Sequence, residues 1–526
     1  MSGAPRGAAA DYYDQSNKPQ YSAPQGPPPN GQQFGQAPPQ YGQKYSNGTE
    51  EGYTVANGEK PSFEQAFKLQ GPKYHDIWAG ILLILVFLGF VAVSAISVRG
   101  YALTKGFNGG GIYDSSNTFG LDTNTLVLFV FCLLVAFVLS YGYMWLARAF
   151  TKQFIWITGI LNIIFGFATA AYMLSRRYWS GGIVFLLFSI FTVICFISWI
   201  PRIPFSVLML QTSIDVSKKF GHVYLVSLIG GIVATAFGAW YSVTLVAVYV
   251  NFSPGSNPAC STGVGSCSRA TVIGLVVFIT FAMYWISEWI KNTIHTTIAG
   301  VYGSWYFCSH NFPSNATRGA FRRATTYSFG SISLGSLLVA IINMLRQACS
   351  VAQRSEGMQG NMVGYIAFCI LGCLISVLQW AVQFVNRYAF CHIALYGKPY
   401  IKAAKDTWKM LTQRGIDALI NELLIGPVLT MGATFIAYAC ALLAYLYLLF
   451  TEPEYNRDGS FTPVVVAFAF LIGLQICNIF TTPLSSGVET IMVASAWDPE
   501  VLMRDHPDLY ARMIAVYPKV QQAIHA

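Results

Sequence analysis

The residues best suited to chemistry lie in one apolar run between residues 271 and 307. At the spacing of a helix, one face of this run collects Phe281, Tyr284, Trp285, Glu288, Asn292 and His295. A carboxylate among aromatic rings is what recognition of an organic cation requires, above all of a quaternary ammonium. The same acid and imidazole could instead move protons. A third interpretation is structural, in which Glu288 pairs with Lys291 and the tryptophans form an aromatic belt at the membrane surface.

Two further carboxylates stand in apolar surroundings, Glu422 and Glu489. If these acids and Glu288 lie at helix ends on one side of a membrane, they line a vestibule that collects cations. The alternative is three independent interface anchors. Trp380, Gln383 and Asn386 form another polar and aromatic stripe, which runs toward Arg387 and Tyr388. The candidate substrate-binding residues are therefore Trp285, Glu288, Trp289, Tyr302, Trp305, Trp380 and Glu422.

Motifs of soluble catalysis are absent from the sequence, which has no GxxxxGK[ST] phosphate loop, no HExxH, no GxSxG and no CxxC zinc pair. ATP-driven pumping by this chain is therefore not expected, and no cofactor or metal site is predicted. A membrane acyltransferase that uses His295 or His392 would need no such motif. A satisfied structural histidine is the simpler interpretation of both residues, so we do not expect an enzyme.

The elements that must position these side chains are long apolar runs. Hydrophobic residues make up 54% of the 526 residues and charged residues 10%, which is far from the balance of a soluble domain. About 20 apolar residues in a helix cross the hydrocarbon core of a bilayer. We predict an all-α fold, a polytopic membrane bundle of about ten transmembrane helices. The predicted spans are 77–98, 125–147, 154–174, 180–200, 223–250, 271–290, 326–345, 362–385, 419–450 and 463–482.

Three apolar stretches continue past these limits, at 294–309, 388–396 and 487–497, which indicates long tilted helices or interfacial segments. Ser331 has a small residue, Gly335, four positions later, a spacing typical of close helix contacts in lipid. Pro483 is expected to break the tenth helix, and transporters often expose backbone to substrate at such breaks.

Basic residues sort unevenly between alternate loops, and the cytoplasmic side of a membrane retains more Lys and Arg. The poorer side holds Arg99, Lys105, Arg176, Arg177, Arg269, Arg346, Arg354 and Arg457. Both termini are therefore expected in the cytoplasm. The same bias explains the net charge of +9 without a nucleic-acid partner.

The ends of the chain differ in composition from its middle. Residues 1–60 are rich in Pro, Gln, Gly and Tyr, which predicts a disordered cytoplasmic tail, and they contain no signal peptide. Residues 61–76 are a candidate amphipathic helix on the inner leaflet. The membrane domain is expected over 77–497, followed by a cytoplasmic tail over 498–526.

The loop after the fifth span carries two candidate modifications. Cys260 and Cys267 share this outer loop, where an oxidising compartment would allow a local disulfide. Asn251 begins an Asn-Phe-Ser sequon and is a candidate glycosylation site. The sequons at Asn47 and Asn315 fall on the predicted inner side, so they should remain unmodified.

Three segments of the chain resemble the choline transporter-like proteins, and most closely their fungal pH-nine-sensitive branch. They are HTTIAGVYGSWYF from 295, SFGSISLGSLLVAIINMLR from 328 and NRYAFCHIALYGKPYIKAAKDTWKML from 386. The resemblance implies about ten transmembrane helices with both ends inside and a plasma-membrane transporter of choline and related amines. Unlike the animal proteins, this chain has a short outer loop over 99–124 that lacks cysteine.

We therefore expect a plasma-membrane transporter that moves a small organic cation, choline or a related amine, by alternating access without ATP. Aromatic rings would contact the cation, and Glu288 or Glu422 would balance its charge. One alternative is a non-transporting membrane scaffold whose tail recruits partners. The other is a membrane-embedded lipid-modifying enzyme that depends on His392. The expected partners are the lipid bilayer and a small-molecule substrate, and not nucleic acid.

Overall fold

The chain adopts a helical bundle in a computed structural model, which describes residues 73–105, 123–252, 268–308, 312–313, 315–413, 424–452 and 462–518. Within these ranges the secondary structure is helical and no strand occurs. Ten segments are long and apolar enough to cross a membrane, which confirms the predicted fold class and number of spans. The fourth of them joins two consecutive helices, Trp179–Trp199 and Ile203–Lys219.

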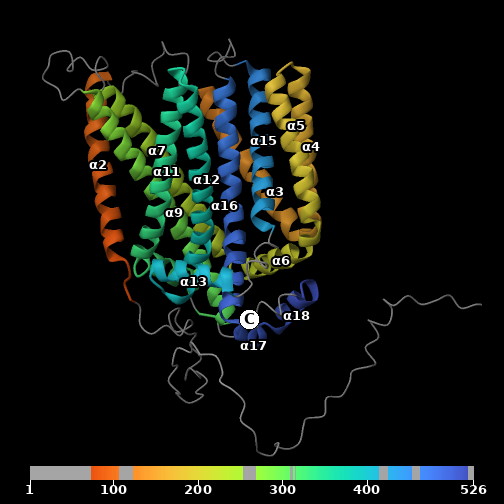
Figure 1. The fold of residues 1–526 in the computed structure, drawn as a ribbon. Helices are drawn as coiled ribbons and strands as arrows, with labels where there is room; N and C mark the ends of the chain where they lie inside the picture. Colours follow the sequence, from red (N-terminus) through yellow and green to blue (C-terminus); the bar gives the residue numbers. More distant parts are fainter. Residues whose placement is uncertain are drawn as a thin grey trace, which may run out of the picture. The chain divides into compact units, whose positions relative to one another are not determined.

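The long helices lie side by side in the bundle (Figure 1). They are α2 (Ile77–Lys105), α3 (Thr123–Ala149), α4 (Thr151–Ser175), α5 (Trp179–Trp199), α7 (His222–Phe252), α9 (Arg269–Phe307), α11 (Phe329–Met358), α12 (Met362–Tyr396), α15 (Ile425–Thr451) and α16 (Thr462–Trp497). Each expected extension beyond the hydrocarbon core is a continuation of α9, α12 or α16. The long apolar runs therefore form continuous helices that reach beyond the span itself.

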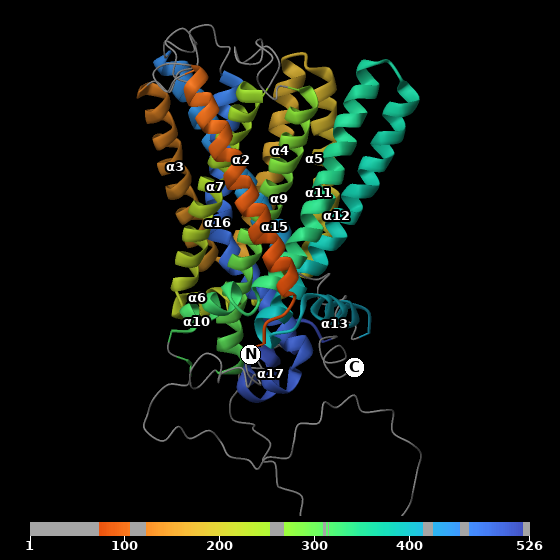
Figure 2. The same cartoon turned by 90° about the vertical axis from the view of Figure 1, so that its left-hand side faces the viewer.

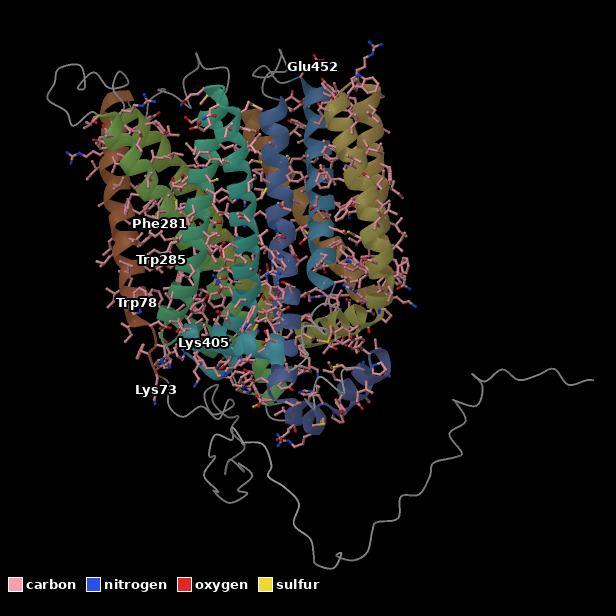
Figure 3. All side chains as sticks on the ribbon, in the orientation of Figure 1. Lys73, Trp78, Phe281, Trp285, Lys405 and Glu452 are labelled. Carbon is pink, nitrogen blue, oxygen red and sulfur yellow. The ribbon has the colours of Figure 1, made fainter. Side chains whose placement is uncertain are left out.

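Shorter helices gather at one end of the bundle, as Figures 1 and 2 show. They are η1 (Ile200–Arg202), α6 (Ile203–Lys219), α10 (Ala316–Thr325), α13 (Tyr400–Gln413), α17 (Pro499–Asp505) and α18 (Pro507–Val516). Lys73 and Lys405 lie at this end, whereas Glu452 lies at the opposite one (Figure 3). We call the end that carries α6, α10, α13, α17 and α18 the basic end.

The core of the bundle is built on α9 and α16 near the basic end. From Asn292 onward almost every residue of α9 is buried, and residues 491–496 of α16 are buried throughout. Their apolar side chains pack with those of α6 and α12 in one cluster. Added atoms at Gly487 would overlap the ring of Tyr302, so α9 and α16 approach each other closely at this glycine.

The expectation that Pro483 breaks the tenth helix is wrong, because α16 runs unbroken from Thr462 to Trp497. Proline has no N–H to donate to the carbonyl of Ile479, four residues earlier. That carbonyl instead accepts a hydrogen bond from Ser227 Oγ of α7 at 2.6 Å. A neighbouring helix thus supplies the missing donor, which is how membrane helices tolerate proline.

Hydrogen bonds at the basic end hold the start of α2 against two other helices. Asp76 Oδ2 accepts hydrogen bonds from Ser331 Oγ at 2.7 Å and from the backbone N–H of Tyr400 at 2.9 Å. These bonds join the start of α2 to α11 and α13. A side chain at Gly330 would overlap the carbonyl oxygens of His75 and Asp76, so this approach requires glycine.

Several sequence predictions lie outside the described residues. They concern the tail over 1–60, most of the proposed surface helix over 61–76, Cys260, Cys267 and Glu422. Residues 73–76 are described and are not helical.

Candidate functional site

A polar cavity of about 780 Å³ lies among α7, α9, α11, α12, α15 and α16. Its described lining is rich in hydroxyl and amide side chains, and the ionisable residues among it are Glu288, Lys291, His295, Arg387 and Glu489. No aromatic side chain is among the described residues that line it. A cavity of this size fits a small molecule, and ionisable side chains within spanning helices make it the candidate functional site.

Three helices bring the ionisable groups together. Glu288, Lys291 and His295 are three and four residues apart on α9, so they share one face of that helix. Arg387 comes from α12, and Glu489 comes from α16, six residues after Pro483. The geometry therefore unites residues that are nearly 200 positions apart in the chain.

His295 is the buried link between these three helices. Its Nδ1 lies 2.8 Å from Ser486 Oγ on α16 and 3.7 Å from Glu489 Oε2. Its Nε2 lies 2.9 Å from the backbone oxygen of Arg387 on α12. Since the neutral imidazole has one donor and one acceptor nitrogen, donation from Nε2 to this carbonyl leaves Nδ1 to accept from the serine. His295 thereby holds α12 and α16 at fixed positions around the cavity.

The two acids that line the cavity each face a basic partner. Lys291 Nζ lies 3.4 Å from Glu288 Oε2, and an Arg387 guanidinium nitrogen lies 4.0 Å from Glu489 Oε1. The carboxylate side chains are each 16% exposed, whereas the lysine is 66% and the arginine 56% exposed. The acids therefore lie deeper in the wall than their basic partners.

Amide side chains fix the wall nearest the basic end. Asn292 donates to Ser336 Oγ at 2.9 Å, which ties α9 to α11. Asn386 donates to the carbonyl of Gly335 at 3.1 Å and accepts from the hydroxyl of Tyr400. The cavity is in this way connected by hydrogen bonds to α13. Burial raises the pKa of the Tyr400 phenol to about 12.

Glu288 is the one predicted substrate-binding residue that the described cavity wall contains. Trp285 of α9 is buried, and its Nε1 donates to the carbonyl of Ser333 on α11 at 2.9 Å. Trp289 packs edge-on against Phe329. These two rings hold helices together on the side of α9 that faces α11.

The remaining aromatic candidates lie at separate places. Tyr302 is buried near the basic end and donates to the backbone oxygen of Ser213. Trp305 packs on the ring of His506. Trp380 is 66% exposed on the outer face of α12. The structure therefore does not bring the predicted aromatic rings together around Glu288.

Part of the lining escaped the sequence prediction. Gln475, Asn478 and Thr482 of α16 line the cavity together with Ser486 and Glu489. These residues recur every three or four positions within an apolar run, which is a helical polar stripe. The expected break at Pro483 concealed this stripe, because it divided the run into two elements.

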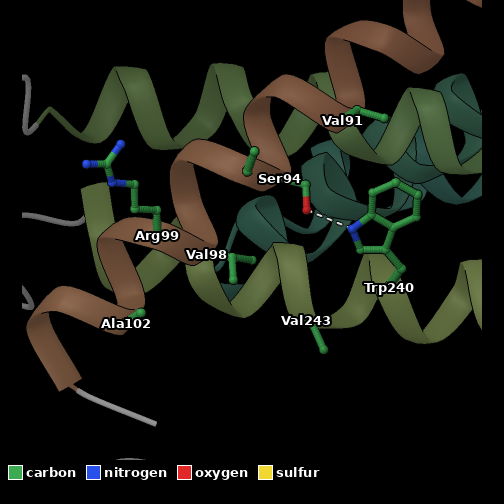
Figure 4. Close-up of a pocket in the computed structure, with 8 residues that line it drawn as sticks. Val91, Ser94, Val98, Arg99, Ala102, Trp240 and Val243 are labelled. Carbon is green, nitrogen blue, oxygen red and sulfur yellow. Dashed lines mark hydrogen bonds between the residues drawn. The ribbon is translucent and has the colours of Figure 1, made fainter.

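A second hollow lies at the periphery, between α2 and α7 (Figure 4). It measures about 520 Å³ and is lined mainly by apolar side chains, with Arg99 as the one charged residue among the described residues that line it. Trp240 Nε1 donates across it to Ser94 Oγ at 2.8 Å. This groove offers little chemistry for recognising a polar solute, so we place the candidate site in the polar cavity.

The described residues offer no candidate metal centre, and the predicted modifications remain untested. Within the described ranges, no group of three or more His, Cys, Asp or Glu side chains is arranged to hold a metal ion. Asn251 lies in the last turn of α7, beside Gly100 of α2. Its glycosylation stays a prediction, as does the disulfide between Cys260 and Cys267.

Comparison with known proteins identifies the family. Residues 183–500 match the family described as plasma-membrane choline transporter. Protein PNS1 of Gibberella zeae is 64% identical over 482 residues, which cover 91% of this chain and 89% of that protein. Protein pns1 of Aspergillus fumigatus is 66% identical over 468 residues, 88% of this chain and 87% of the relative. Protein PNS1 of Saccharomyces cerevisiae is 42% identical over 469 residues, 87% of each. This chain therefore belongs to the choline transporter-like family.

Proposed function

We propose that this protein carries a small organic amine, choline or a related compound, across the plasma membrane through the polar cavity. The observation that carries the proposal is the cavity itself, about 780 Å³ in volume and lined by hydroxyl, amide and ionisable side chains among apolar spanning helices. Polar and ionisable side chains are costly inside a bilayer, so where they occur they commonly mark the path of a solute or ion. Glu288 and Glu489 are the groups that would balance an ammonium charge.

Alternating access without ATP is the mechanism we propose. Figure 2 shows the α11–α12 hairpin diverging from the other described helices toward the end opposite the basic end. The buried residues of α12 begin only at Asn386, where the hairpin meets α9 and α16. Rocking of this hairpin about that contact would open the cavity to one side and then to the other. The bonds from Asn386 to Tyr400 and from His295 to the backbone of α12 are those that such a motion would strain.

The distribution of charge supports an orientation of the bundle in the membrane. We propose that the basic end faces the cytoplasm, because cytoplasmic segments retain the excess of Lys and Arg. The last described helices, α17 and α18, lie at that end, and the described chain begins there at Lys73 (Figures 1 and 3). Both termini would then be cytoplasmic.

The test is uptake of labelled choline into liposomes that contain the purified protein, compared with empty liposomes. Gly238 lines the cavity, and a Cβ added there would meet no atom within 4 Å. Gly238→Trp should therefore be tolerated at its Cβ, place the indole ring at the cavity and abolish saturable uptake.

Gly274→Trp is the matched control. Gly274 is also helical with no atom within 4 Å of an added Cβ, but it does not line the cavity. It should retain uptake close to that of the unmodified protein. Equal uptake by both variants would show that the solute does not pass through this cavity.

A further inference from the structure

We propose that the cavity recognises a zwitterion, an amine that also carries a carboxylate or phosphate group, in preference to a simple cation. This inference rests on the proposed function and narrows its substrate class. The geometry that points to it is the pairing of two carboxylates with two basic side chains in one cavity wall.

The first argument is charge balance. Glu288 and Glu489 contribute two negative charges to the lining, and Lys291 and Arg387 contribute two positive ones. A site that selects a simple cation needs a surplus of negative charge to offset the loss of hydration. Among the described lining residues the carboxylates do not outnumber the lysine and arginine, so this part of the wall is matched to a solute whose own charges cancel.

The second argument is accessibility. The side chains of Lys291 and Arg387 are 66% and 56% exposed, while those of Glu288 and Glu489 are both 16% exposed. A solute in the cavity therefore meets the basic groups at least as readily as the acids. An anionic group on the solute would pair with the basic side chains, which have three and five N–H donors.

The third argument concerns the ion pairs already present. A simple cation that approached Glu288 would compete with Lys291, whose Nζ lies 3.4 Å from the carboxylate. Displacing that lysine would break this ion pair without offering the lysine another anion. A zwitterion avoids this cost, because its anionic group takes the place of the carboxylate that its ammonium has engaged.

The fourth argument is the nature of the wall. Choline and its carboxylate counterpart share a trimethylammonium group, so a preference between them must come from the rest of the solute. Aromatic rings, which would hold that shared group, are absent from the described lining. It has amides and hydroxyls instead, among them Gln383, Gln475 and Asn478. These groups suit a solute that accepts hydrogen bonds, as a carboxylate or phosphate does.

The experiment compares two probes of similar size in proteoliposomes, choline and its carboxylate counterpart glycine betaine. We expect saturable uptake of both, with betaine competing against labelled choline at about tenfold lower concentration than unlabelled choline does. Lys291→Gln should weaken betaine uptake by about tenfold or more and change choline uptake much less, because it removes a charged hydrogen-bond donor for the anionic group. Lys291→Arg, which keeps a charged hydrogen-bond donor at this position, should retain the betaine uptake that Lys291→Gln loses.

Lys405→Gln is the matched control, since Lys405 is exposed on α13 and does not line the cavity (Figure 3). It should leave both uptakes unchanged. Saturable choline uptake without competition by betaine would overturn the zwitterion inference and leave the amine transporter in place. Uptake of neither probe by folded protein would overturn both proposals. An equal loss of both uptakes in Lys291→Gln would overturn the assignment of Lys291 to the anionic group.

Discussion

Replacing Ser227 should destabilise the protein, because its hydroxyl supplies the donor that Pro483 lacks. Ser227 Oγ donates to the carbonyl of Ile479 at 2.6 Å, and both residues are buried. Ser227→Ala would leave this carbonyl without its donor, four residues before a proline that cannot provide one. Hydrogen bonds between membrane helices contribute about 0.6–1.7 kcal/mol, and an unsatisfied buried group costs about 1–3 kcal/mol. We therefore expect a loss of about 1–2 kcal/mol in the free energy of unfolding.

The proline makes this prediction specific. Pro483→Ala restores the backbone N–H, which can then donate to Ile479 as in any helix. In that background Ser227→Ala should cost less than about 0.5 kcal/mol, so the double-mutant cycle should give a coupling energy of about 1 kcal/mol. The measurement is equilibrium unfolding of the four proteins in mixed micelles.

Ser242→Ala serves as the control on the same helix. Its hydroxyl donates to Gly238 within α7 and is exposed, so its removal should cost little in either background. If Ser227→Ala costs the same with and without the proline, the hydroxyl does not compensate for Pro483 and our account of the unbroken α16 is incorrect.

Three further predictions address the cavity and its supports. Glu288→Gln should abolish amine uptake in proteoliposomes while the protein remains folded, because it removes a carboxylate of the lining; normal uptake would exclude this acid from the mechanism. Gly330→Ala should lower the thermal stability of the purified protein, since the new methyl group would overlap the carbonyl oxygens of His75 and Asp76, and an unchanged melting temperature would contradict that contact. The pKa of Tyr400 is raised from 10.0 to about 12 in the folded state, so the unfolded chain loses this proton first and stability falls as pH rises above 10. At pH 11.5 the Tyr400→Phe variant should lose about 2 kcal/mol less of its free energy of unfolding than the unmodified protein does. If the free energies of unfolding of the two proteins change in parallel with pH, the raised pKa of Tyr400 is refuted.

The sequence alone was sufficient to predict the class of fold and the family. Ten apolar runs of spanning length are a local property, because a helix in lipid must satisfy its own backbone. They appear in the structure as ten spans. The three segments beginning at His295, Ser328 and Asn386 indicated the choline transporter-like family, which the match over residues 183–500 confirms.

The composition of the site was predicted only in part. Helical periodicity correctly placed Glu288 and His295 on one face of α9, and both line the cavity. The same periodicity added Trp285, which instead donates to the backbone of α11 and packs between two helices. Helical periodicity predicts which residues lie on the same face of a helix. It does not predict which part of that face contacts a neighbouring helix and which part lines a cavity.

Only the tertiary structure decided how the cavity is assembled. Arg387 and Glu489 meet His295 because α12 and α16 pack against α9. The order of these helices in the chain does not predict that they pack together. The continuity of α16 through Pro483 likewise depends on a hydroxyl of α7 that is distant in sequence. Local sequence therefore determined where helices form and which of their faces are polar. Packing between helices, which depends on the shapes of several segments at once, decided which polar faces meet and which proline is accommodated.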